Sequence, residues 1–308
     1  MIILTDKDLS GYSFGKNVTV INANEKSLNK FNKNSEVVAI AGSRAMAIKA
    51  VTLDFPSLKL FQLTSAGFDN VPLEKYKEKN IYLCNAGSTY SIPIAETVVF
   101  SMLLMAKKLR KNAKNRRFKL LRHYSEITEL ADKKVLIMGA GNIGTAIAER
   151  LLPFSMHVDG YDPYCAEKKE YKSILRTREQ LINEIANYDF VISTMPANDD
   201  TKGFINAEIF ANMRKTAVVV NVGRKAVFND KDFYRALKKK QVGGAVLDMF
   251  EKLPNPITNK FRRLKNVIVL PGVSAISKEV NIRLKEHMSK NVIKVLEGEK
   301  PQNVINGV

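Results

Sequence analysis

The stretch that decides the fold is Lys134–Asp162, KVLIMGAGNIGTAIAERLLPFSMHVDGYD. Its first apolar run, Val135–Met138, is typical of a buried strand and leads into the glycine-rich turn Gly139–Gly144, after which residues repeat at helical spacing. A second strand pattern then ends at Asp162, 18 residues after the last glycine of the turn. A glycine turn between a strand and a helix, with an acidic residue about 20 positions further on, predicts a dinucleotide-binding unit. The alternative is a glycine turn in an α/β domain that binds no ligand.

The residues of this turn have distinct expected roles in binding a dinucleotide. Gly139 permits the tight turn, Gly141 lets the backbone approach a pyrophosphate, and Gly144 lets helix and strand pack closely. Asn142 and Ile143 then begin a helix whose free N–H groups and dipole favour phosphate. We expect all five residues to bind the cofactor.

The acidic residue at the end of the second strand selects between two cofactors. The Asp162 carboxylate can accept hydrogen bonds from a ribose diol and repels a 2′-phosphate. The sequence therefore favours NAD (as NAD or NADH) over NADP.

Composition places the chain among ordinary globular proteins with room for two domains. It has 308 residues, of which 45% are hydrophobic and 26% charged. Cys84 and Cys165 indicate neither a disulfide framework nor a metal cluster, and three histidines leave little material for a metal site. No signal peptide is evident, and the apolar run around residues 98–106 is about half of what spans a bilayer. We expect a cytoplasmic protein that binds no membrane.

The net charge of +18 is concentrated in one segment. Residues 107–122, KKLRKNAKNRRFKLLR, hold nine basic residues and no acidic one. One interpretation is a patch for nucleic acid or another polyanion. The favoured interpretation is a solvated helix face or a surface that meets an acidic partner subunit, because aromatic residues are scarce there and no nucleic-acid-binding fold is matched.

Alternating strand and helix patterns predict two parallel sheets with helical crossovers. A long helix is expected to begin near Ile92, capped by Ser91 with Pro93 in its first turn, and an amphipathic helix to run from Lys278 to Gly298. Two domains of this kind would leave a substrate cleft between them. The expected strands are residues 2–4, 18–21, 37–40, 60–63 and 81–84 in the first series, and 135–138, 157–161, 190–194, 217–221, 244–247 and 267–270 in the second.

Several further motifs resemble, in order and over nearly the whole chain, the D-isomer-specific 2-hydroxyacid dehydrogenases. They are TSAGFDN at 64–70, NAG at 85–87 with IAE at 94–96, the GAGNIG turn, TMP at 194–196 with Thr201, NVGR at 221–224 and GAVLDMFE at 244–251. The resemblance implies two α/β domains. A flavodoxin-like substrate domain comprises residues 1–91 and 275–308, and a Rossmann NAD-binding domain comprises residues 92–274.

The resemblance also implies the site residues. Arg224 matches the arginine that binds the substrate carboxylate and polarises its 2-oxo group, for which a planar, permanently charged guanidinium is suited. The backbone amides of Ala66 and Gly67 match the loop that holds the same carboxylate. Asp248 matches the acidic residue near the nicotinamide carboxamide.

The remaining matches lie along the cofactor. Val222, with Gly223 beside it, matches the backbone contact to the nicotinamide carboxamide. Met195, Pro196 and Thr201 match the loop beside the adenosine and phosphates. Relatives pair through the helix after the first domain, so a homodimer through residues 92–120 is expected.

The chain departs from the family pattern at three positions. Gly272 stands where the family has its proton-donating histidine, and Leu253 stands where it has the glutamate that orients that histidine. Lys225 replaces the usual glycine after the arginine, where a side chain can crowd the site. A general acid contributes about 10²–10⁴ in rate, so a slow or altered enzyme is expected.

The sequence leaves three functions open. The first is an NAD-dependent oxidoreductase acting on a small 2-oxo or 2-hydroxy acid, with Lys225, Ser274, Lys252 or water as the replacement proton donor. The second is a catalytically inactive protein that binds NAD(H) as a sensor or scaffold. Nucleic-acid binding through residues 107–122 is the weakest of the three.

Overall fold

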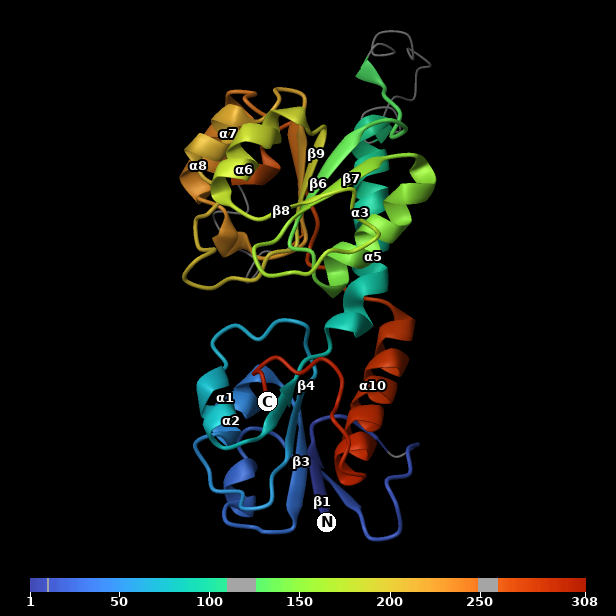
Figure 1. Cartoon of the computed structure of the whole chain (residues 1–308), viewed down its shortest axis with the longest axis vertical. Coiled ribbons are helices and arrows are strands. Elements are labelled where there is room, and N and C mark those ends of the chain that lie inside the picture. Colours follow the sequence, from blue (N-terminus) through green and yellow to red (C-terminus); the bar gives the residue numbers. More distant parts are fainter. Residues whose placement is uncertain (10, 110–125, 249–259) are drawn as a thin grey trace. The chain divides into compact units, whose positions relative to one another are not determined.

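The computed structural model describes residues 1–9, 11–109, 126–248 and 260–308. The chain divides into two compact units (Figure 1). Unit 1 comprises Met1–Tyr90 and Ser277–Val308, and unit 2 comprises Ser91–Ile276. Each unit is built on its own parallel sheet.

Unit 1 has a five-stranded sheet in the order β2-β1-β3-β4-β5, in which every pairing is parallel. This is the flavodoxin-like strand order, as the resemblance implies. In Figure 1, helices α1 (Arg44–Ala50) and α2 (Leu73–Glu78) cover one face of the sheet, and α10 (Lys278–Leu296) covers the other. The strands are β1 (Ile2–Thr5), β2 (Thr19–Asn22), β3 (Val37–Gly42), β4 (Leu60–Leu63) and β5 (Tyr82–Cys84).

Unit 2 has a seven-stranded parallel sheet in the order β12-β11-β10-β9-β6-β7-β8. Its first six strands along the chain reproduce the Rossmann order, and β12 extends one edge. The strands are β6 (Lys134–Met138), β7 (His157–Tyr161), β8 (Ile174–Leu175), β9 (Phe190–Ser193), β10 (Val218–Asn221), β11 (Gly244–Leu247) and β12 (Val267–Val269).

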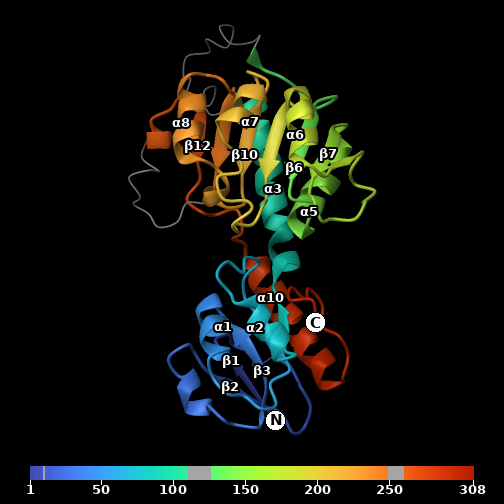
Figure 2. The same ribbon diagram turned by 60° about the vertical axis from the view of Figure 1, so that its left-hand side comes forward.

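Helices cover both faces of this sheet (Figures 1 and 2). Helix α5 (Asn142–Leu151) and the unit 2 part of α3 (Gly87–Ala106) lie on one face. Helices α6 (Arg178–Glu184), α7 (Ala207–Asn212) and α8 (Asp230–Lys238) lie on the other, where buried aromatic rings fill the space between helices and strands. Short 3-10 turns lie at residues 28–31, 152–154, 185–187 and 225–227, and residues 260–262 are helical.

The predicted strands agree with the structure to within two residues, and the short strand β8 was missed. The predicted start of the long helix is wrong, because α3 begins at Gly87 and Pro93 lies inside it. Pro93 has no N–H to donate to the carbonyl of Thr89 four residues earlier. Nε of Arg283, on α10, donates to that carbonyl at 3.3 Å instead. A contact distant in the sequence therefore helps to accommodate a proline that local rules place at a helix start.

Helix α3 also differs in length from the predicted apolar run. Among the residues that the structure describes, it is the helix long and apolar enough, by length and composition alone, to cross a membrane. Half of the apolar stretch of this helix is buried inside the protein, and Val98 and Met102 are fully buried. A mostly buried core helix has the same composition.

Candidate functional site

The predicted glycine turn lies where strand order reverses in unit 2, between the neighbouring strands β6 and β9. Gly139 has φ +97°, a conformation that favours glycine, and a Cβ there would lie 2.6 Å from Oγ1 of Thr194. That hydroxyl donates to the carbonyl of Gly139 at 2.8 Å. A Cβ on Gly144 would collide with the same carbonyl oxygen. Both glycines are therefore required by close packing at the switch point, which is where α/β sheets bind dinucleotides.

Gly141 differs from its two neighbours because a Cβ there would meet no atom within 4 Å. It is the N-cap of α5, and the N–H groups of Asn142 and Ile143 in the first turn donate to no acceptor among the described residues. Open space in front of unpaired N–H groups at the start of a ten-residue helix suits a pyrophosphate. The residues present therefore fit a dinucleotide.

Asp162 follows β7, and backbone amides occupy its carboxylate. Oδ2 accepts from the N–H of Ala140 at 3.0 Å, and Oδ1 accepts from the N–H groups of Tyr164 and Cys165 at 3.0 and 3.1 Å. The side chain thus ties the second strand to the glycine turn. Carboxylate oxygens accept more than one hydrogen bond each, so acceptor capacity for a ribose hydroxyl remains.

A lysine that the sequence reasoning did not single out lies against this turn. Nζ of Lys168 donates to the carbonyl of Ala140 at 2.7 Å and to Oγ1 of Thr145 at 2.9 Å. It places a positive charge beside the glycine turn. Its position depends on the course of the chain after Asp162, which no local motif predicts.

The predicted adenosine loop follows β9. Thr201 closes it, because its Oγ1 donates to the carbonyl of Pro196 at 2.7 Å and accepts from the N–H of Asn198 at 2.9 Å. Met195 is buried. Thr201, which the resemblance matches to the adenosine loop, therefore also stabilises the conformation of that loop.

Val222, Gly223 and Arg224 follow β10. The N–H groups of Val222 and Gly223 both donate to the carbonyl of Ser193, at 3.1 and 2.9 Å, which fastens this segment to the end of β9. Arg224 is partly buried. The unusual Lys225 forms an ion pair of 3.0 Å with Asp230 at the start of α8. Its ammonium group is therefore engaged within unit 2.

Asp248 follows β11 and is 1% exposed. Its Oδ1 accepts from the N–H of Val273 at 2.9 Å, and its Oδ2 accepts from the N–H of Ser274 at 3.1 Å and from the Ser274 hydroxyl. Gly272, which the resemblance matches to the family histidine, is exposed with φ +76°. The carboxylate thus holds the turn that follows β12, and that turn has a left-handed residue at the histidine position.

Ala66 and Gly67 lie in unit 1, in the loop after β4. The carbonyls of this loop are fastened by four donors, Ala86 N–H, Tyr90 hydroxyl, Asn85 Nδ2 and Ser65 hydroxyl. The N–H groups of Ala66 and Gly67 donate to no acceptor within the described ranges. Two adjacent unpaired amides on a fixed backbone can bind a carboxylate.

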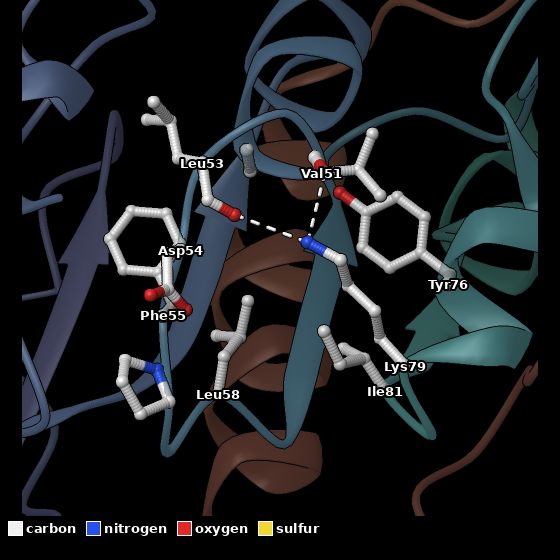
Figure 3. A pocket seen from close by; sticks show the side chains of 10 residues that line it. Val51, Leu53, Asp54, Phe55, Leu58, Tyr76, Lys79 and Ile81 are labelled. Atoms are coloured by element: carbon white, nitrogen blue, oxygen red, sulfur yellow. Dashed lines mark hydrogen bonds between the residues drawn. The ribbon is translucent and has the colours of Figure 1, made fainter. Parts of the chain in front are cut away.

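A separate cavity of about 250 Å³ lies near the starts of β4 and β5, whereas the loop of Ala66 and Gly67 follows the end of β4 (Figure 3). Nζ of Lys79 there donates to the carbonyls of Val51 and Leu53 at 3.1 and 3.2 Å, at the end of α1. This lysine stabilises the end of a helix. The cavity is not part of the predicted site.

Two predictions lie outside the described residues. The family glutamate position, Leu253, is one of them, together with Lys252 as a proton donor. Most of the basic segment, residues 110–122, is the other.

Comparisons with known proteins identify the family. A family model described as "D-isomer specific 2-hydroxyacid dehydrogenase, NAD binding domain" matches residues 98–274. D-3-phosphoglycerate dehydrogenase of Methanocaldococcus jannaschii is 33% identical over 251 residues, which are 81% of this chain and 48% of that protein. The chain thus spans about half the length of this curated relative.

Solved structures share the fold over the whole chain. A D-isomer-specific 2-hydroxyacid dehydrogenase family protein from Aeromonas salmonicida superimposes with a TM-score of 0.78 at 23% identity, covering 99% of this chain and 97% of that one. An NADPH-dependent glyoxylate/hydroxypyruvate reductase from Sinorhizobium meliloti, in complex with NADP and malonate, gives a TM-score of 0.75 at 21% identity, covering 99% and 96%. With the Rossmann strand order and the glycine turn at its switch point, the family match shows that residues 98–274 are an NAD-binding domain and that the chain belongs to the D-isomer-specific 2-hydroxyacid dehydrogenase family.

Proposed function

We propose that the protein is an NAD-dependent oxidoreductase that interconverts a small 2-oxo acid and the matching 2-hydroxy acid, with an altered route for the proton. The observation that carries the proposal is the glycine turn at the switch point, where Gly139 and Gly144 are fixed by packing and Gly141 faces open space. A relative named D-3-phosphoglycerate dehydrogenase supports the same class of substrate.

Two kinds of carboxylate-binding group are proposed for the substrate. One is the pair of amides of Ala66 and Gly67, which have no acceptor among the described residues, and the other is the guanidinium of Arg224. Arginine binds a carboxylate in a fixed orientation and stabilises charge that develops on a carbonyl oxygen. When bound, NADH supplies the hydride that reduces the 2-oxo carbon. Arg224 is therefore the residue on which turnover should depend most.

The proton must come from a group other than the family histidine. The hydroxyl of Ser274 donates to Asp248 and the ammonium of Lys225 is paired with Asp230, so both are engaged. Gly272 offers no side chain, and its exposed turn leaves room for solvent. We therefore propose water as the proton donor, at the cost of the rate that a general acid contributes, about 10²–10⁴.

The second candidate is a protein that binds NAD(H) without turning over a substrate. The turn at Gly272 favours it, because this left-handed, exposed glycine, matched to the family histidine, carries no titratable group. Both candidates require NADH to bind at the glycine-rich turn Gly139–Gly144. They differ in whether a 2-oxo acid oxidises it.

We propose NADH as the preferred cofactor. Asp162 places a carboxylate at the end of β7, where it repels a 2′-phosphate, while Lys168 nearby reduces that repulsion. NADH is therefore expected to bind more tightly than NADPH, by a modest factor.

We further propose a homodimer that uses α3. Phe100 is 55% exposed and Ile92, eight residues earlier on the same helix, is 36% exposed, with the exposed Glu96 between them. Because contiguous exposed apolar surface marks interaction sites, we place the proposed interface around Phe100.

The test of the proposed function is NADH oxidation by concentrated protein against a panel of short 2-oxo acids. Binding of NADH and of NADPH is measured in the same samples by nicotinamide fluorescence. Turnover that Arg224→Ala abolishes, with NADH binding retained, would support the enzyme. NADH binding without turnover of any acid would favour the sensor, and absence of NADH binding would refute both.

A further inference from the structure

We propose that His287, a buried histidine in unit 1, positions the carboxylate-binding loop by fixing Asn85, whose side chain holds the carbonyl of Ala66. The inference rests on the proposed function, because it assumes that the amides of Ala66 and Gly67 bind the substrate carboxylate. His287 would be a positioning residue, since it acts through Asn85. It would therefore set substrate affinity without contacting substrate.

The first link joins α10 to the segment after β5. His287 is 9% exposed, and its Nε2 lies 3.1 Å from the backbone carbonyl oxygen of Asn85. A carbonyl oxygen accepts only, so this contact requires a proton on Nε2. The amide nitrogen of Asn291 lies 3.4 Å from the same Nε2, but its two hydrogens have closer acceptors in Gln62 Oε1, at 2.6 Å, and the Gln302 carbonyl, at 3.0 Å. The neighbours of the ring thus favour the tautomer that donates to Asn85.

The second link runs from Asn85 to the loop. Nδ2 of Asn85 donates to the carbonyl of Ala66 at 2.9 Å, and its Oδ1 accepts from the N–H of Gly87 at 3.2 Å. The side-chain amide is therefore held at both of its ends. Because His287 fixes the backbone of Asn85, the position of the Ala66 carbonyl depends on the imidazole.

The same segment fastens the loop a second time. The N–H of Ala86 donates to the carbonyl of Ser65 at 3.0 Å. Asn85 and Ala86 thus bind two successive loop carbonyls, while the N–H groups of Ala66 and Gly67 have no acceptor in the part of the chain that the structure describes. Preorganised donors bind an anion without paying to order the loop. A shift of the Asn85 segment would move both carbonyls together.

The ring acts as a neutral donor. Burial lowers the pKa of His287 below its ordinary value, and the nearby charge of Lys290 acts in the same direction, while the hydrogen bond to Asn85 opposes them. Around neutral pH the imidazole therefore donates to Asn85 without bringing a positive charge. A glutamine in its place can present an amide N–H at a similar distance along the side chain, whereas leucine fills space and donates nothing.

The test compares His287→Leu, His287→Gln and a control, Val292→Ala, in the full chain. Val292 is fully buried on the same helix and belongs to an apolar cluster with Ile3, Ala39, Leu60 and Cys84 of the sheet. As an apolar side chain it donates no hydrogen bond to the carbonyl of Asn85. It reports the effect of merely destabilising unit 1. Two quantities are measured: the dissociation constant of oxamate, a 2-oxo-acid analogue, in the presence of NADH, and hydrogen exchange at the Ala86 amide, which donates to the loop.

We expect His287→Leu to weaken oxamate binding about tenfold and to speed exchange at Ala86, with the dissociation constant of NADH unchanged. His287→Gln should recover most of both effects, and Val292→Ala should show neither. Unchanged exchange at Ala86 in His287→Leu, or equal effects of His287→Leu and Val292→Ala, would overturn the inference. Failure of the wild-type protein to bind oxamate would instead refute the proposed function, and it would be seen before any variant is compared.

Discussion

The carboxylate of Asp248 accepts both the backbone N–H and the hydroxyl of Ser274, 26 residues later in the chain. The pair joins the end of β11 to the turn after β12, and both residues are almost completely buried. A buried carboxylate needs such partners, because burying a charge without hydrogen bonds is costly. The residue matched to the nicotinamide contact therefore also determines the shape of the turn at the histidine position.

We expect Ser274→Ala to destabilise unit 2. The substitution removes a hydroxyl donor to a buried carboxylate, and hydrogen bonds to charged groups contribute about 1.5–3 kcal/mol. The free energy of unfolding in urea measures the loss, and Ser274→Thr, which keeps the hydroxyl, is the control. A change below about 0.5 kcal/mol, the range of ordinary surface substitutions, would contradict the assigned contact.

Replacing the glycine at the histidine position should strain the backbone. Gly272 has φ +76°, where an L side chain costs about 1–2 kcal/mol. We expect Gly272→His and Gly272→Ala to lose similar stability in urea unfolding, since a Cβ there meets no closer atom than the Asp248 carbonyl oxygen at 4.0 Å. Gly272→Asn should lose less, because asparagine tolerates this conformation better. Equal stability of the alanine variant and the wild type would show that the turn is not left-handed.

The two helix-side glycines of the GAGNIG turn should respond differently to alanine. Gly144→Ala brings a methyl group into the carbonyl of Gly139, so both stability and NADH binding should fall. Gly141→Ala puts a methyl group into open space, so the protein should fold normally while NADH binding weakens. Thermal unfolding and NADH fluorescence separate the two outcomes. Normal NADH affinity in Gly141→Ala would argue against this turn as the pyrophosphate site.

The buried imidazole should make stability depend on pH. The pKa of His287 is lowered in the folded protein, mainly by burial, so the folded state binds fewer protons than the unfolded chain. The contribution of the neutral ring is complete above the unfolded pKa of about 6.5 and is lost as the pH falls through and below that value. The stability difference between wild type and His287→Gln should therefore shift against the wild type on acidification. Urea unfolding at several pH values measures it, and a constant difference would contradict the prediction.

The exposed aromatic side chain of Phe100, on α3, allows a test of the proposed homodimer. Phe100→Glu adds a second acidic side chain to the exposed face of α3 and should convert a dimer into a monomer, because burying an unpaired charge in an interface is unfavourable. Sedimentation equilibrium measures the state of assembly. Glu96→Gln, on the same exposed side of the helix, is a milder control. A wild-type monomer would refute the proposed interface.

Local sequence patterns determine much of this fold. The apolar runs predicted eleven of the strands, because a parallel strand that helices cover on both faces must be apolar on both, although the edge strand β2 is mostly exposed. The two-residue strand β8 was missed, since Ile174 and Leu175 are too short a run to show a period. The start of α3 was misplaced because Pro93 is read locally as a helix start, whereas Arg283 of α10 supplies a partner for the carbonyl that the proline leaves.

The candidate site likewise has features that the sequence predicts and features that depend on the tertiary structure. The sequence by itself determined the cofactor turn, and it predicts that Gly272 stands at the position of the family histidine, because glycine spacing and the identity of one residue are local properties. Only the tertiary structure decided that Asp248 is bound to Ser274, that Lys168 lies against the glycine turn, and that His287 reaches the loop at Ala66 through Asn85. These contacts join residues up to about two hundred positions apart, and a hydrogen bond over that separation exists only once the sheet and helices have brought its donor and acceptor to within about 3 Å.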